Sequence, residues 1–121
     1  MQILVTVVKN SYWKGRNKMS VVHLTSENFS ETVEKEGVVA VIDFYADWCG
    51  PCKMFAPVFE ELAQENDTAV FAKVNVDNEE SIAIKYGVMS IPTVVVLKDG
   101  VEIARNVGLA GKQKILDMIS K

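Results

Sequence analysis

The segment Val38–Ala46 constrains the fold more than any other part of this sequence. It has the β-branched and aromatic character of a strand, and both faces of that strand are apolar except at Asp43. A strand with one face in water alternates polar and apolar residues, so an apolar pattern on both faces indicates a strand covered by helices on both sides. We therefore expect an α/β fold in which this strand lies inside the sheet.

The chain after Met19 alternates between strand-like and helix-like patterns, with no long linker and no internal repeat. Helices are expected from Thr25 or Ser26 to about Lys35, from Cys49 to about Glu65, in a short segment that Asn78 opens and Gly87 ends, and within Lys112–Lys121. Further strands are expected over Val21–Leu24, Phe71–Val76, Thr93–Leu97 and Val101–Val107, the last two joined by a tight turn at Asp99-Gly100. Together they form one domain, residues 19–121.

Residues 1–18 form a separate N-terminal extension. Their apolar run Gln2–Val8 resembles the core of a secretory signal, but the basic residues between Lys9 and Lys18 all follow that run, whereas a signal carries its basic residues before the core. Two interpretations remain: an added strand or arm, or non-native residues before a true start at Met19. The second is favoured because the regular folding pattern begins at Met19.

Composition excludes two classes of partner. The chain has 13 basic and 16 acidic residues, a net charge of −3, and no basic block that could follow a nucleic-acid backbone. No apolar run approaches the roughly 18 residues that span a bilayer, since the runs Val38–Ile42 and Val94–Leu97 each stop at a charged residue. We expect a soluble protein that binds neither nucleic acid nor membranes.

Cys49 and Cys52 are the only cysteines, and they flank Gly50-Pro51 at the start of a helical pattern. A structural zinc site uses four cysteine or histidine ligands, and this chain adds one distant histidine, His23, so no metal site is expected. Side chains at i and i+3 of a helix lie close enough to close into a disulfide after small adjustments. The spacing therefore favours a redox-active pair over an inert pair that fills core volume.

The two cysteines are expected to differ in reactivity. At a helix N-terminus, unpaired N–H groups and the positive end of the helix dipole stabilise a thiolate, which lowers the pKa of Cys49 below the ~8.5 of a free thiol. Cys49 is therefore the expected nucleophile. Cys52, one turn inside the helix, is less exposed and is the expected resolving thiol, which attacks the mixed disulfide and releases the reduced target.

Three further residues are open to two interpretations each. Asp43 is either a buried carboxyl with a raised pKa that exchanges protons with Cys52, or an aspartate at a strand end that reaches solvent or a backbone donor. Trp48 is a packing residue, a docking surface for the target, or both. Lys73 either pairs with Asp43 from a neighbouring strand or is solvated.

The segments Phe44–Lys53, Gly87–Thr93 and Lys98–Gly100 make the chain resemble the thioredoxin family from about Met19 to its C-terminus. The resemblance implies a mixed sheet with helices on both faces. It also implies that Pro92 is cis, although only about 5–6% of X-Pro bonds are cis. Tyr45 departs from the tryptophan that many members carry, and residues 1–18 have no counterpart there. By the same resemblance Cys49, Cys52, Asp43 and Lys73 are catalytic, and the target groove is bordered by Trp48, Gly50, Pro51, Ile91, Pro92, Thr93 and Gly108.

The resemblance also implies a function: a cytoplasmic, monomeric protein-disulfide reductase with no bound cofactor. Its electrons would come from a thioredoxin reductase, NADPH- or ferredoxin-linked, and pass to disulfide-containing target proteins. Gly50-Pro51 favours reduction, because isomerases and strong oxidants of the superfamily usually have a histidine there. Two alternatives remain: a non-catalytic binding subunit that clamps a partner around Trp48 and Pro92, and a dimer bridged by a metal between two cysteine pairs.

Overall fold

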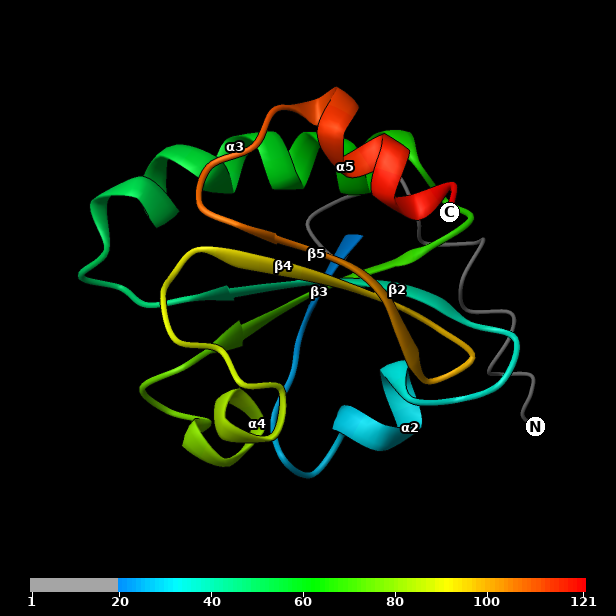
Figure 1. The fold of residues 1–121 in the computed structure, drawn as a ribbon, viewed down its shortest axis with the longest axis horizontal. Coiled ribbons are helices and arrows are strands. Elements are labelled where there is room, and N and C mark those ends of the chain that lie inside the picture. Colours follow the sequence, from blue (N-terminus) through cyan, green and yellow to red (C-terminus); the bar gives the residue numbers. More distant parts are fainter. Residues whose placement is uncertain (1–19) are drawn as a thin grey trace.

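A five-stranded mixed sheet forms the centre of the computed structural model, which describes residues 20–121 (Figure 1). The strand order is β1-β3-β2-β4-β5, with β1, β3 and β2 parallel to one another and β4 and β5 antiparallel to their neighbours. The mixed sheet implied by the sequence is therefore confirmed. The strands are β1 Val21–His23, β2 Val39–Tyr45, β3 Val70–Asn75, β4 Thr93–Lys98 and β5 Val101–Val107.

Helices cover both faces of the sheet, as expected. In Figure 1, α3 and α5 lie on one face and α2 and α4 lie on the other. This three-layer arrangement buries two apolar clusters, one on each side of the sheet. The helices are α2 Phe29–Val33, α3 Gly50–Glu65, α4 Glu80–Lys85 and α5 Lys112–Ile119.

The central strand β2 explains why the sequence is apolar on both strand faces. Ala40, Ile42 and Phe44 belong to the apolar cluster that includes residues of α2 and α4, whereas Val41 belongs to the cluster that includes residues of α3 and α5. Because side chains alternate along a strand, Asp43 lies on the same face as Val41, the face that α3 covers. The one charged residue of the strand is thus placed beneath the helix that carries the cysteines.

The first described helix is shorter than the sequence predicts. The Oγ1 atom of Thr25 accepts hydrogen bonds from the N–H groups of Glu27 and Asn28, at 3.2 and 3.4 Å, and the Oδ1 atom of Asn28 accepts one from the N–H group of Thr25, at 2.8 Å. These local bonds fold the segment into a turn, so α2 begins only at Phe29. It ends at Val33, two residues before Lys35.

The hairpin between β4 and β5 confirms the turn that Asp99-Gly100 predicts. Both residues have positive φ, 54° and 82°, which the tight turns of two-residue hairpins require. The Oδ1 atom of Asp99 also accepts a hydrogen bond of 2.6 Å from the N–H group of Gly37, which ties the hairpin to the loop before β2. The turn therefore sets the strand register and fixes a second loop.

Residues 1–19 lie outside the described part of the chain, and so does the expectation of an N-terminal extension over 1–18. Within residues 20–121 no helix has the length and apolar character needed to cross a bilayer.

Candidate active site

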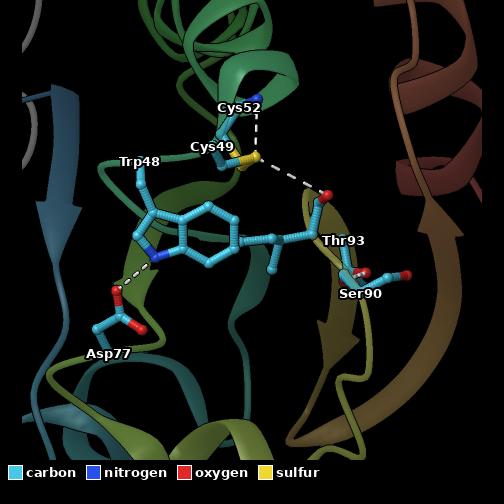
Figure 2. The surroundings of a disulfide bond; sticks show 7 residues. Trp48, Cys49, Cys52, Asp77, Ser90 and Thr93 are labelled. Carbon is cyan, nitrogen blue, oxygen red and sulfur yellow. Dashed lines mark hydrogen bonds between the residues drawn. A yellow bond between two sulfur atoms is a disulfide. The ribbon is translucent and has the colours of Figure 1, made fainter.

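The two cysteines occupy the start of α3 and are joined as a disulfide, with their Cα atoms 5.2 Å apart. Cys49 is the N-cap of the helix in an extended conformation, and its Sγ atom accepts a hydrogen bond of 3.2 Å from the N–H group of Cys52 (Figure 2). Pro51 occupies the first turn, where its missing N–H group leaves no helical bond unmade. The redox pair predicted from the spacing is confirmed at the expected helix end.

An apolar groove of about 480 Å³ opens beside the disulfide, and only one of the two cysteines lines it. Both are 4% exposed, so the expected difference in exposure is absent in this disulfide form. What distinguishes them is that Cys49 lines the groove and Cys52 does not. The lining residues, none of which is charged, are Trp48, Cys49, Gly50, Pro51, Val76, Val88, Met89, Ser90 and Ile91.

The loop between α4 and β4 forms the wall of the groove across from the helix. Its Ile91–Pro92 peptide bond is cis, as the family resemblance implied, and the carbonyl oxygen of Ile91 lies 3.9 Å from the Sγ atom of Cys49. The Thr93 hydroxyl donates a hydrogen bond of 2.6 Å to the carbonyl oxygen of Ser90 (Figure 2). The N–H group of Gly108 donates one of 2.8 Å to the carbonyl oxygen of Pro92. These bonds fix the loop beside the sulfur.

The structure divides the residues expected to border the groove into two groups. Trp48, Gly50, Pro51 and Ile91 line it. Pro92, Thr93 and Gly108 are not among the lining residues: the side chain of Thr93 is buried, and Thr93 and Gly108 instead bond to the loop from behind. The second group supports the wall of the groove.

Four lining residues were not among those expected to border the groove: Val76, Val88, Met89 and Ser90. Two signals could have found them. Residues 88–90 directly precede Ile91-Pro92 in the same loop, so a groove beside Ile91-Pro92 is expected to include them. Val76 follows β3, whose end pairs with the end of β2 at Tyr45 and Asn75, just before the cysteine segment. Met89 is 94% exposed and contributes apolar surface to the rim.

Trp48 is a surface residue. Its side chain is 69% exposed, and its indole Nε1–H donates a hydrogen bond of 2.8 Å to the Oδ2 atom of Asp77, which holds the ring at the groove (Figure 2). A core packing role is therefore wrong for Trp48. An exposed, oriented aromatic ring at the edge of an apolar groove is suited to contact with a partner protein.

Asp43 is completely buried, and within residues 20–121 neither of its carboxyl oxygens has a hydrogen-bond partner. The interpretation of a strand-end aspartate that reaches solvent or a backbone donor is therefore wrong. Burial without compensating bonds destabilises the charged form and raises the pKa of Asp43 from 3.8 to about 7, against a smaller lowering effect of Lys73. The carboxyl is thus poised to gain or lose a proton near neutral pH.

Lys73 is the residue of β3 in register with Asp43 of β2, so the two strands are neighbours as the pairing interpretation required. The described contacts include no ion pair between them. The ammonium group instead lies 4.4 Å from the centroid of the Tyr45 ring, a cation–π contact on the same face of the sheet. Lys73 therefore acts on Asp43 through space rather than by direct contact.

Replacing Lys73 with methionine is expected to raise the pKa of Asp43 above its value of about 7, because the lysine charge is what lowers it in the folded protein. Carbon-13 NMR titration of the aspartate carboxyl signals would measure the shift. A pKa of Asp43 that stays the same in Lys73→Met would show that the lysine charge does not reach the carboxyl.

A dithiol that closes into a disulfide at a helix start, with one sulfur in an apolar groove and a buried carboxyl under the same helix, defines the class of protein-disulfide oxidoreductases. The family model described as Thioredoxin matches residues 20–121. The chain therefore belongs to the thioredoxin family, and its activity is that of a thioredoxin-type disulfide reductase.

Curated relatives and solved structures agree with this assignment. The chain is 48% identical over 104 residues to thioredoxin of Bacillus subtilis, covering 85% of this chain and 98% of the relative. It is 45% identical over 98 residues to thioredoxin of Chlamydia trachomatis, covering 81% and 94%. Among solved structures, a mutant thioredoxin from Halobacterium salinarum superposes with a TM-score of 0.75 at 37% identity, covering 83% of this chain and 88% of that one.

Proposed function

We propose that Cys49 is the thiol that attacks disulfides of target proteins and that Cys52 is the thiol that resolves the mixed disulfide. The observation that carries this assignment is placement: Cys49 lines the groove and caps the helix, whereas Cys52 is inside the first turn and away from the groove. The N–H groups at the helix start stabilise a thiolate at Cys49. A disulfide entering the groove therefore meets the more nucleophilic sulfur first.

The reaction starts from the reduced protein, with Cys49 as thiolate and Cys52 as thiol. The Cys49 sulfur bonds to one sulfur of the target disulfide, whose S–S bond breaks, and the released target thiolate takes a proton from solvent. Cys52 then gives up its proton and attacks the Sγ atom of Cys49, which forms the intramolecular disulfide and releases the second target sulfur. Two electrons pass to the target, and its two sulfurs take up two protons.

Asp43 is the proposed acceptor of the proton that Cys52 gives up. Its carboxyl is on the sheet face that α3 covers, and its pKa of about 7 lets it act as a base in one step and an acid in the next near neutral pH. Lys73 lowers that pKa through its charge and so helps to set the pH range of the resolving step.

The apolar groove is the proposed docking site for target proteins. Trp48, Gly50, Pro51 and Ile91 contact the target, and Pro92, Thr93 and Gly108 hold the opposing loop in place. This division is supported by the lining of the groove and by the bonds behind the loop.

The partners follow from the reaction. Disulfide-containing proteins consume the electrons, and a reductase must return the Cys49–Cys52 disulfide to the dithiol. We propose a thioredoxin reductase, NADPH- or ferredoxin-linked, for that step, and a monomer acting in the cytoplasm, where a reducing glutathione pool is maintained.

An assay of insulin reduction with NADPH and a thioredoxin reductase tests the function and the two thiol roles together. The native protein is expected to turn over insulin, whereas Cys52→Ser is expected to stop after one attack and accumulate a Cys49 mixed disulfide with insulin, visible by mass spectrometry. Failure of the native protein to reduce insulin would reject the reductase. A mixed disulfide at Cys52 in the matched Cys49→Ser variant would reverse the assignment of the two roles.

A further inference from the structure

We propose that Arg105, Glu102 and Glu34 hold the loop that forms the far wall of the groove, and that Arg105 is a positioning residue for the docking of target proteins. The inference rests on the proposed role of the groove as the docking site. None of the three residues lines the groove, so each acts through the loop that starts at Tyr86.

The carbonyl group of Tyr86 is held from β5. Arg105 donates from Nη2 to the Tyr86 carbonyl oxygen at 2.6 Å. The same guanidinium is oriented by Glu102, with Nε 2.8 Å from Oε2 and Nη2 2.9 Å from Oε1. A bidentate pair fixes the plane of the guanidinium, so its remaining donor is aimed at one acceptor. Glu102 therefore orients Arg105, and Arg105 holds the carbonyl group at the start of the loop.

The side chain of Tyr86 is held from the end of α2. Its hydroxyl donates to the Oε2 atom of Glu34 at 2.5 Å, and Lys85 donates to the same oxygen at 2.7 Å. Burial acts to raise the pKa of Glu34, but the hydrogen bonds from Lys85, Tyr86 and Ser30 outweigh it and lower the pKa, so this acceptor is charged at neutral pH. The ring of Tyr86 also packs against Phe29, with centroids 5.6 Å apart.

The strand β5 thereby supports both ends of the loop. Arg105 bonds to the carbonyl oxygen of Tyr86 at the start, and Gly108, directly after the strand, bonds to the carbonyl oxygen of Pro92 at the end. Between these two points lie Val88, Met89, Ser90 and Ile91, which form one wall of the groove. Because both anchors come from the same end of one strand, loss of the Arg105 bond weakens the hold on the start of the wall, while Gly108 still fixes its end.

The reacting sulfurs are on α3, on the other side of the groove, and no described contact joins them to Arg105. Loosening the loop should therefore weaken the docking of a protein that fills the groove. It should leave unchanged the reaction with a small disulfide that needs only the Cys49 sulfur, because Ile91 beside that sulfur adjoins Pro92, which Gly108 still holds. This difference between large and small substrates separates a positioning role from general loss of structure.

The test compares Arg105→Met, which keeps an unbranched stem and removes the guanidinium donors, with Arg105→Lys and with the matched control Lys112→Met. Lys112 pairs with Glu61 and Glu65 of α3 and makes no described contact with the loop. Arg105→Met is expected to raise KM for insulin about 5- to 10-fold with little change in kcat. Its rate with hydroxyethyl disulfide should stay within about twofold of native. Arg105→Lys should have a KM for insulin between those of the native protein and Arg105→Met. Lys112→Met should have the native KM.

An unchanged KM for insulin in Arg105→Met would overturn the proposal, and so would an equal loss of rate with both substrates. If circular dichroism shows that Arg105→Met does not fold, Tyr86→Phe decides in its place. That variant keeps the packed ring, removes the bond to Glu34, and should raise KM for insulin alone. Failure of the docking role itself is separately visible, because the native protein would then show no advantage of insulin over hydroxyethyl disulfide.

Discussion

Replacing Cys49 with serine is expected to abolish the reduction of protein disulfides, with a loss of at least about 10³-fold. A serine hydroxyl stays protonated where a thiol at a helix start ionises, and an alkoxide cannot take part in thiol–disulfide exchange. Cys52 remains in the variant, but it does not line the groove and is 4% exposed. Insulin reduction coupled to NADPH oxidation would measure the loss.

The control for this variant is the reduced native protein, because Cys49→Ser also lacks the disulfide. Circular dichroism and thermal unfolding of both should show the same fold. Activity within about tenfold of native would contradict the role of Cys49 as the nucleophile. Survival of biological function in a variant with serine at both positions, despite loss of insulin reduction, would support a binding subunit instead.

Much of the fold follows from local sequence patterns. The apolar run of β2 is explained by helices on both faces, and Asp99-Gly100 forms the tight turn its residue types predict. The start of α3 at the cysteine pair follows from a capping position and a proline in the first turn. The turn and the helix start depend on interactions within a few residues, and the burial of β2 is visible in the run of apolar residues itself.

Where the sequence left an outcome open or predicted it wrongly, polar groups had more than one nearby partner to choose from. Whether Lys73 pairs with Asp43 depends on the register of β2 against β3 and on the competing ring of Tyr45, which alternation alone does not reveal. The start of α2 depends on the side chains of Thr25 and Asn28, which bond to nearby N–H groups and fold the segment into a turn before the helix. The sequence pattern does not show which of several nearby groups a side chain contacts.

The groove shows the same limit at longer range. Sequence similarity could point to Ile91-Pro92, but the position of Val88 and Met89 depends on anchors such as Arg105, far along the chain. The equal burial of Cys49 and Cys52 depends likewise on the loop that covers them, since the carbonyl oxygen of Ile91 lies 3.9 Å from the Cys49 sulfur. Contacts between distant segments were needed to place these residues.

Asp43→Asn is expected to remove a pH-dependent loss of stability of about 4 kcal/mol. The unfolded carboxyl ionises near 3.8, whereas burial holds the folded pKa at about 7. Below about pH 4 the group is protonated in both states and has no effect. Between these pKa values only the unfolded state ionises, so the free energy of unfolding falls as pH rises, by about 1.4 kcal/mol per unit and about 4 kcal/mol in total above pH 7. Asparagine has nearly the same shape and no proton to lose.

Urea unfolding of the disulfide forms of both proteins, near pH 4 and about pH 8, measures this effect. The difference between their free energies of unfolding should change from one pH to the other. The free energy of unfolding of Asp43→Asn should increase relative to that of the native protein as pH rises. All other titrating groups are shared, so they do not contribute to this change. Parallel pH profiles would show that Asp43 ionises alike in both states, and its role as proton acceptor would lose its physical basis. If the stability of Asp43→Asn rises relative to the native protein as expected, then the native protein keeps a destabilising carboxyl under α3. That is expected of a group retained for proton transfer to and from Cys52.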